Sequence, residues 1–318
     1  VRNLVVEFAI GRQSKIHAVS DVSFNIDSGE TVGLVGESGC GKSTVARAIV
    51  QLQKPTSGKI WFDGEDMTKC SNNRLRDFKP HLQMIFQDAA ASLNPVRRVG
   101  RTISEPLRAM GESSRRKRNR MARELMREVG LDPDQIYDRR PFEISIGQCQ
   151  RISIARALIT NPKLLVCDEP VSSLDVSVQA QILNLLERMK ARHELTMLFI
   201  SHDLAVVKNI CDRVAVMYLG KIVELGEGNT VFDSPLHPYT QALLSAIPVA
   251  DPEPTAHRQR IVLEGDVPNP ANPPPACRFH TRCIHATEVC RNEMPEFRNL
   301  GAAEKPHMVA CHHAEKFS

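Results

Sequence analysis

A glycine-rich segment between a predicted strand and a predicted helix places the strongest constraint on this chain of 318 residues. Residues 31–36 form an apolar strand pattern, and residues 42–53 have the apolar spacing of a helix. Between them, the sequence GESGCGKS matches the pattern G-x-x-x-x-G-K-[ST]. Because the pattern lies in the strand–loop–helix context that it requires, we predict a phosphate-binding loop rather than a chance glycine-rich turn.

The residue types in this loop suit a nucleotide phosphate. Glycines let consecutive backbone amides curl around phosphate oxygens, and the following helix points its positive N-terminus at the same anion. Lys42 would supply a point charge for the β- and γ-phosphates, and the Ser43 hydroxyl would ligate Mg²⁺. The residues expected to surround the phosphates are Gly36, Glu37, Ser38, Gly39, Cys40, Gly41, Lys42, Ser43 and Thr44. The loop alone predicts nucleotide binding and no particular function.

Strand and helix patterns alternate along most of the chain. This alternation predicts an α/β fold, with a mostly parallel sheet that has helices on both faces. The strand patterns are residues 1–10, 16–26, 31–36, 58–64, 81–86, 163–169 and 196–201, and the helical patterns include residues 42–53, 101–130, 152–158 and 182–189.

Polar side chains follow three of the predicted strands. Asp168 and Glu169 end the buried strand pattern LLVCDE, Gln87 follows HLQMIF, and His202 follows TMLFIS. Ligands of open α/β sheets bind at the edge where parallel strands end, so these side chains are expected near the phosphate loop. An acidic residue there can hold a metal-bound water, and a second can polarise the attacking water. A helix cap is the alternative role for the carboxylate pair.

Taken together, these segments resemble the ATP-binding subunits of ABC transporters. The phosphate loop, Gln87, SIGQ (145–148), LLVCDE (164–169), SSLD (172–175) and His202 occur in that family's order. The resemblance covers about residues 1–247. It implies a P-loop NTPase cassette with a mostly parallel core sheet, an N-terminal antiparallel β part and a helical subdomain at about residues 88–160.

The resemblance also implies roles for single residues. Glu169 would be the catalytic base, His202 the γ-phosphate contact, and Asp175 the residue that communicates across a dimer. Phe8, in the first strand pattern, is the best candidate to stack on adenine, and a core strand residue is the alternative for it. The implied Mg²⁺ ligands are Ser43, Gln87 and Asp168.

Three longer stretches resemble the oligopeptide/dipeptide importer subfamily, which also includes nickel and glutathione importers. They are FQDAAASLNPVRRVG, VCDEPVSSLDVSVQAQILNLL and SPLHPYTQALLSAIP, in which Ala89 and Val96 depart from the usual proline and arginine. The resemblance implies an ATPase that powers peptide import from the cytoplasmic side of a bacterial inner membrane. Its partners would be a second ATP-binding subunit, two transmembrane permease subunits and, indirectly, a periplasmic or extracellular substrate-binding protein. No apolar run approaches the length of a membrane-spanning helix, and no signal peptide precedes the first strand pattern.

One signature of the family is altered in this chain. The family sequence Leu-Ser-Gly-Gly-Gln is replaced by residues 144–148, in which Ile146 takes the place of the first glycine. A β-branched residue is poorly suited to positive φ or to close approach by a phosphate. Because each ATP in an ABC dimer contacts the partner's signature, we predict a heterodimer with two unequal ATP sites. Ser145, Gly147 and Gln148 are retained as expected γ-phosphate contacts, and a tolerated substitution is the alternative.

From about residue 248 the composition changes, and we predict a Pro-rich linker and a small Cys-rich module over residues 248–318. Four cysteines there follow the spacing C-x5-C-x6-C-x20-C, without the close C-x2-C pairs of zinc ribbons. Four thiolates suit Zn²⁺ or an iron–sulfur cluster. The resemblance extends to the tails of peptide-importer ATPases and favours a 4Fe–4S cluster; zinc or no metal are the alternatives. The cysteines are Cys277, Cys283, Cys290 and Cys311.

Charge and domain content weigh against other functions. The formal net charge is only +4, too weak to predict a nucleic-acid partner, and the basic run SSRRKRNR (113–120) is best explained as a solvated helix face. ABC ATPases of repair or translation carry tandem cassettes, coiled-coil arms or zinc insertions, which are lacking here. A non-hydrolysing nucleotide-binding regulator is the second alternative. Ile146 favours it, and Glu169 with His202 argues against it.

Overall fold

The computed structural model describes residues 1–11, 14–247 and 261–317. It divides into two compact units. Unit 1 comprises Val1–Asn25, Val32–Thr68 and Ser201–Ser318, and unit 2 comprises Ile26–Thr31 and Lys69–Ile200. Residues 248–260, predicted to be a Pro-rich linker, lie outside the described residues.

An antiparallel sheet begins unit 1. Its strands have the order β2 (Ser14–Val22), β1 (Arg2–Ile10), β4 (Ser57–Lys59). Leu4 and Val6 of β1 are buried, as expected for a strand with one face on the core, while Phe8 to Ile10 at its end are exposed. The single strand predicted at 58–64 is wrong: β5 (Trp61–Phe62) leaves β4 and pairs with β6 (Glu65–Asp66). Asp63 and Gly64 both have positive φ, which is the backbone of a two-residue hairpin turn.

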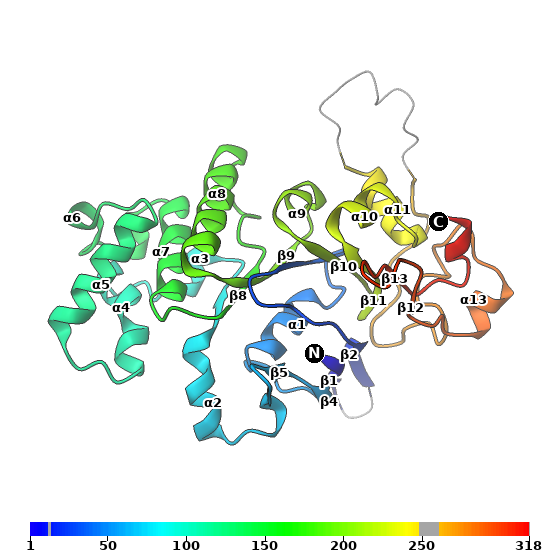
Figure 1. Cartoon of the computed structure of the whole chain (residues 1–318), viewed down its shortest axis with the longest axis horizontal. Helices are drawn as coiled ribbons and strands as arrows, with labels where there is room; N and C mark the ends of the chain where they lie inside the picture. The colour runs from blue at the N-terminus through cyan, green and yellow to red at the C-terminus, as the bar shows by residue number, and fades with distance from the viewer. Residues whose placement is uncertain (12–13, 248–260, 318) are drawn as a thin grey trace. The chain divides into compact units, whose positions relative to one another are not determined.

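A second sheet of unit 1 holds the strand that leads into the phosphate loop. All five residues of β3 (Thr31–Val35) are buried, and the strand is parallel to β10 (Arg213–Tyr218). β10 forms a hairpin with β11 (Lys221–Glu227), and β13 (Met308–Val309) and then β12 (Arg298–Asn299) extend the sheet in antiparallel fashion (Figure 1). The C-terminal segment therefore adds strands to the sheet that contains β3. The helices of unit 1 are α1 (Lys42–Ile49), α9 (Leu204–Ile210), α10 (Gly228–Asp233), α11 (Pro238–Ser245) and α13 (Glu288–Asn292).

Unit 2 contains a parallel sheet of the order β9 (Thr196–Ser201), β8 (Leu164–Asp168), β7 (Leu82–Ile85). Every residue of β8 is buried, which matches the continuous apolar run that predicted it. The register pairs Ile85 of β7 with Cys167 of β8, so these two strands end close together.

The helices of unit 2 surround α7, which packs against α3, α4, α5 and α8 as well as β7. The helix predicted over 101–130 is two helices, because the chain turns at Gly111, whose φ is +92°. Figure 1 shows α4, α5, α6 and α7 of this unit grouped together. The helices are α2 (Asn72–Phe78), α3 (Ala89–Ser92), α4 (Val99–Ala109), α5 (Arg115–Glu128), α6 (Pro133–Ile136), α7 (Ile146–Leu158) and α8 (Val176–His193).

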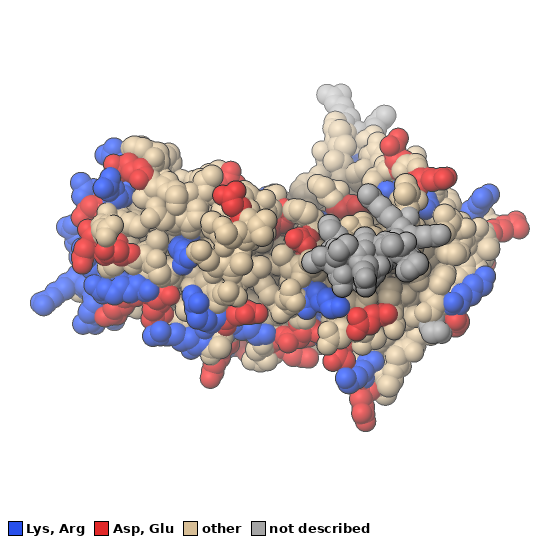
Figure 2. Space-filling model, turned by 90° about the horizontal axis from the view of Figure 1, so that it is seen from above, with Lys and Arg blue, Asp and Glu red and all other residues tan. Residues whose placement is uncertain are grey.

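The basic run lies at the start of α5 and is solvated, as predicted. Ser114 caps the helix, and Ala122, Leu125 and Met126 form its buried face. Figure 2 shows Lys and Arg side chains, with Asp and Glu among them, gathered on the surface of the helices α4 to α6. In the part of the chain that the structure describes, no helix combines the length and apolar character needed to cross a bilayer.

Candidate nucleotide site

The phosphate loop joins β3 to α1 in unit 1, as the sequence predicts. Gly36 and Gly41 have φ values of +149° and +109°, a region that side chains rarely adopt. A Cβ atom at Gly36 would overlap the carbonyl oxygen of Met217, and one at Gly41 would overlap that of Ala18. Backbone conformation and neighbouring carbonyls therefore both require glycine at these positions. Gly41 is also the N-cap residue of α1.

The side chain of Lys42 turns back over the loop. Its Nζ donates hydrogen bonds to the carbonyl oxygens of Gly36 (2.7 Å) and Glu37 (2.9 Å), and the residue is only 5% exposed. Cys40 Sγ lies 3.8 Å from the same nitrogen. Burial raises the pKa of the Cys40 thiol, although the Lys42 charge opposes this, so the thiol remains protonated at neutral pH. The cation is thus held within the loop that would bind phosphate.

The other candidates of unit 1 lie on separate elements. Phe8, on β1, is 37% exposed, which argues against the alternative of a core residue. Ser43 and Thr44 are in the first turn of α1. His202 lies between the end of β9 and Asp203, whose carboxylate caps α9 through Ala205 N at 2.9 Å.

In unit 2 the structure brings two predicted residues together. Asp168, the last residue of β8, is 2% exposed. Glu169 follows with a φ of +48°, and its N–H donates to the carbonyl oxygen of Ile200 at 3.0 Å. Gln87 Nε2 donates to Glu169 Oε2 at 2.9 Å. The amide and the carboxylate predicted from the ends of two different strands therefore meet, as the parallel register requires.

The altered signature forms the N-terminus of α7. Ser145 is the N-cap, its hydroxyl accepts from Gln148 N at 3.3 Å, and Gln148 Oε1 accepts from Ser145 N at 3.0 Å. Ile146 is the first helical residue, and its side chain is 56% exposed. It is not among the residues with positive φ, so of the two ways in which a β-branched residue could be unsuitable here, only the close approach of a phosphate remains. A Cβ atom at Gly147 would approach Val178 Cγ1 to 3.0 Å.

Asp175 is the N-cap residue of α8 and has extended backbone geometry. The segment before it is hydrogen-bonded to the backbone of Glu169, the predicted catalytic base, because Ser172 Oγ donates to the Glu169 carbonyl oxygen at 3.1 Å. Gln179 holds the same segment by donating to the carbonyl oxygens of Val171 and Leu174.

Sequence reasoning missed two partners of the phosphate loop. The carboxylate of Glu37 forms a salt bridge with Arg282, and the Glu37 N–H donates to Tyr239 Oη at 2.8 Å. No motif or spacing in the sequence links these positions.

The four C-terminal cysteines are free thiols. Cys277 N donates to the carbonyl oxygen of Cys290 at 3.1 Å. Burial and the charges of Cys290, Cys311 and Cys283 raise the pKa of Cys277 to about 11. Among the described residues, no three His, Cys, Asp or Glu side chains lie close enough to hold one metal ion.

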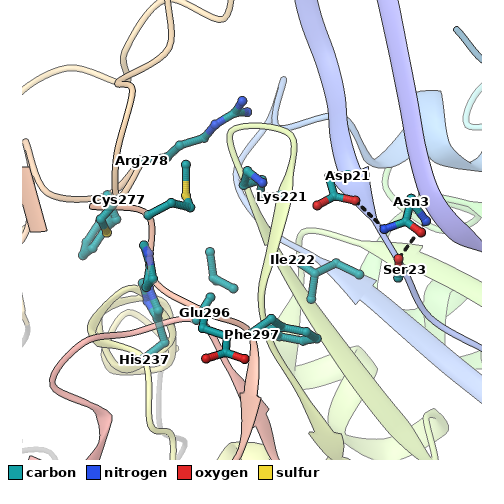
Figure 3. Close-up of a pocket in the computed structure, with 15 residues that line it drawn as sticks. Asn3, Asp21, Ser23, Lys221, Ile222, His237, Cys277, Arg278, Glu296 and Phe297 are labelled. Carbon is teal, nitrogen blue, oxygen red and sulfur yellow. Dashed lines mark hydrogen bonds between the residues drawn. The ribbon is translucent and has the colours of Figure 1, made fainter. Parts of the chain in front are cut away.

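A cavity of about 430 Å³ lies elsewhere in unit 1 (Figure 3). Lys221 and Arg278 line it on one side, and the hydrogen-bonded Asn3 and Asp21 lie on another. None of the predicted nucleotide residues lines this cavity, so it is not the phosphate site.

Comparison with known proteins decides the family. A model described as "ABC transporter" matches residues 19–172, and one described as "Oligopeptide/dipeptide transporter, C-terminal region" matches residues 223–290. An oligopeptide transport ATP-binding protein of Bacillus subtilis is 51% identical, over 93% of this chain and 89% of its own length. The chain belongs to the ATP-binding proteins of oligopeptide/dipeptide ABC transporters.

Other proteins agree with this family. A di/tripeptide transport ATP-binding protein of Pseudomonas aeruginosa is 44% identical over 99% of this ABC ATPase and 97% of its own length. Among solved structures, a dimeric ATP-binding cassette in a post-hydrolysis state with ADP and phosphate has a TM-score of 0.64 and 27% identity, covering 71% of this chain and 97% of that one. The predicted subfamily and the predicted P-loop cassette fold are confirmed.

Proposed function

We propose that this chain hydrolyses ATP at its own phosphate loop to power peptide import across a bacterial membrane. The hydrogen bond between Gln87 and Glu169 supports hydrolysis most directly, because it positions a carboxylate at the edge where ligands of such sheets bind. The relatives described above are named for oligopeptides and di/tripeptides, which favours peptides over nickel or glutathione.

In the proposed reaction, Glu169 accepts a proton from a water molecule as its oxygen attacks the γ-phosphorus. The bond from that phosphorus to the bridging oxygen breaks, and ADP leaves with the electron pair. Lys42 and His202 stabilise the charge on the phosphoryl oxygens. The hydroxyl, amide and carboxylate oxygens of Ser43, Gln87 and Asp168 are the ligand types that Mg²⁺ prefers. When bound, Mg²⁺ would neutralise phosphate charge.

The proposed assembly contains a second ATP-binding subunit and two transmembrane permeases, with a substrate-binding protein as an indirect partner. Ser145 and Gly147 would then serve the partner's phosphate loop, and Asp175 would lie near the dimer contact. Ile146 presents an exposed, bulky side chain at the helix N-terminus that would approach the partner's phosphate. We therefore retain the proposal of a heterodimer with unequal sites, peripheral to the cytoplasmic face of the membrane.

We further propose that the four C-terminal thiols hold a 4Fe–4S cluster. The donor set is thiols alone, which is the ligand type that iron–sulfur clusters take. Burial, and after it repulsion from the neighbouring thiolates, raises the pKa values of the Cys277 and Cys311 thiols, and bound metal would offset both effects. Anaerobic purification followed by iron and sulfide analysis tests this. Protein without iron or visible absorbance would refute it.

Reconstitution with the partner subunits tests the function. We expect ATP hydrolysis coupled to peptide uptake, and loss of both in Lys42→Ala. A complex that takes up peptide while releasing no phosphate at this chain's loop would support the non-hydrolysing regulator instead. An assembled chain without affinity for ATP would refute both.

A further inference from the structure

The C-terminal segment reaches the phosphate loop through one ion pair. Arg282 Nη1 lies 2.8 Å from Glu37 Oε2, and Nη2 lies 3.2 Å from Oε1. The two side chains are 8% and 27% exposed. A bidentate, mostly buried guanidinium–carboxylate pair fixes the orientation of both groups, unlike a single contact at the surface.

Glu37 is also held through its backbone. Its N–H donates to Tyr239 Oη at 2.8 Å, and its carbonyl oxygen accepts from Lys42 Nζ at 2.9 Å. Three polar groups of Glu37 therefore have partners, and one of these partners is the lysine that would contact the β- and γ-phosphates. The position of Lys42 is linked to that of Glu37 through a single hydrogen bond.

An aromatic cluster makes this arrangement rigid. Phe279 lies 5.2 Å from Tyr218 and 5.4 Å from Tyr239, measured between ring centroids, and is 2% exposed. Tyr218 and Tyr239 are themselves 4.7 Å apart. The segment that contains Arg282 thus packs against the tyrosine that holds the Glu37 amide.

A second contact lies on the other side of the loop. Gly220 N donates to the carbonyl oxygen of Cys40 at 2.8 Å, and Arg278 donates to the carbonyl oxygen of Leu219. The segment of residues 277–283 therefore braces the phosphate loop directly at Glu37 and, through the β10–β11 turn, at Cys40.

We propose that Arg282 is a positioning residue for ATP binding, and that through Glu37 it holds the phosphate loop and Lys42 in the conformation that accepts the triphosphate. This rests on the proposed function, in which ATP binds at this loop. Arg282 touches neither nucleotide nor water in the reaction. Its loss would weaken the affinity for ATP more than it slows the step after binding.

The test compares Arg282→Gln, Glu37→Gln and the double variant in the assembled transporter, with KM for ATP and kcat measured separately. Each single variant should raise KM about tenfold and change kcat less than about twofold. Because both remove the same interaction, the double variant should be no worse than either single one. Arg282→Lys keeps the positive charge but cannot form the bidentate pair with the carboxylate. Its KM for ATP should therefore lie between those of wild type and Arg282→Gln.

Arg298→Gln is the matched control, because it removes another ion pair of the C-terminal segment, to Glu315, together with a hydrogen bond to the carbonyl oxygen of Cys311, and neither partner contacts the loop. It should leave KM unchanged. Equal KM values in wild type, Glu37→Gln and Arg282→Gln would overturn the proposal, as would additive effects in the double variant or an equal rise in Arg298→Gln. Lys42→Ala separates this failure from failure of the proposed function, because it loses ATP binding whatever Arg282 does.

Discussion

The amide of Gln87 donates a 2.9 Å hydrogen bond to the carboxylate of Glu169, across the ends of two parallel strands. The bond orients Glu169, whose backbone already has the uncommon φ of +48°. The carbonyl oxygen of the same amide is the proposed Mg²⁺ ligand. One amide can therefore position the proposed base with its nitrogen and the proposed metal with its oxygen.

Replacing Glu169 with Gln should separate binding from hydrolysis. The amide keeps the size of the side chain but cannot accept the proton from water, so kcat of the assembled complex should fall about 100-fold or more. ATP affinity should change little, because Lys42 and the loop amides are untouched. Phosphate release and binding of a fluorescent ATP analogue provide the two measurements. A variant with full turnover would remove Glu169 from its proposed role.

Gly41→Ala should damage the phosphate loop. The added Cβ would meet the carbonyl oxygen of Ala18 at a φ of +109°, so we expect the free energy of unfolding to fall by about 2 kcal/mol or more. ATP binding should weaken at least about tenfold, because the loop amides must shift.

Gly64→Ala is the control for this variant. Gly64 has a φ of +81°, but nothing lies within 4 Å of an added Cβ. Gly64→Ala should lower the free energy of unfolding, measured by chemical denaturation, by about 1 kcal/mol and should leave ATP binding unchanged. Equal ATP affinity in Gly41→Ala and Gly64→Ala would show that the tight contact at Ala18 is not needed for the site.

Local sequence patterns predicted some parts of the fold and the site, whereas contacts between distant residues could not be predicted. The phosphate loop and β8 were predictable because a glycine pattern and an apolar run are local signals. The breaks at Ile60, between β4 and β5, and at Gly111 were missed, since neither a single residue within an apolar run nor a single glycine within a periodic stretch by itself predicts a turn. The pair Glu37–Arg282 joins residues 245 positions apart, and no local pattern encodes such a contact.

The interpretation of Ile146 shows a different limit. A β-branched residue suits neither positive φ nor close approach by a phosphate, and the helix that begins at this position removes the first concern because isoleucine has no positive φ there. What the substitution changes is the exposed surface in front of Ser145 and Gly147. We therefore expect Ile146 to affect the contact of this chain with a partner subunit rather than its folding.

Ile146→Gly should accordingly act on the complex. We expect the total ATPase rate of the assembled transporter to rise, at most roughly twofold, as the second site gains activity. The free energy of unfolding of the isolated chain should fall by no more than about 1 kcal/mol, because Gly is a weak helix former at an exposed position. Ile146→Leu keeps the bulk and should leave the rate at the wild-type level. An unchanged rate in Ile146→Gly would favour the tolerated substitution.

His237 should make unit 1 sensitive to acid. The residue is 2% exposed, its Nδ1 accepts from Tyr239 N at 3.0 Å as the cap of α11, and its own N–H donates to Glu224. Burial lowers its pKa to about 4, against an ordinary 6.5, although the charge of Glu224 opposes the shift.

Because the folded state binds this proton less tightly than the unfolded chain, the stabilisation is complete above about pH 6.5 and is lost as the pH falls towards about 4. The loss should reach roughly 3 kcal/mol in the free energy of unfolding, followed by chemical denaturation between about pH 7 and about pH 4.5. Asn at position 237 can cap α11 and does not titrate, so His237→Asn should flatten this slope. If the free energy of unfolding falls with pH equally in wild type and His237→Asn, another group causes the acid sensitivity.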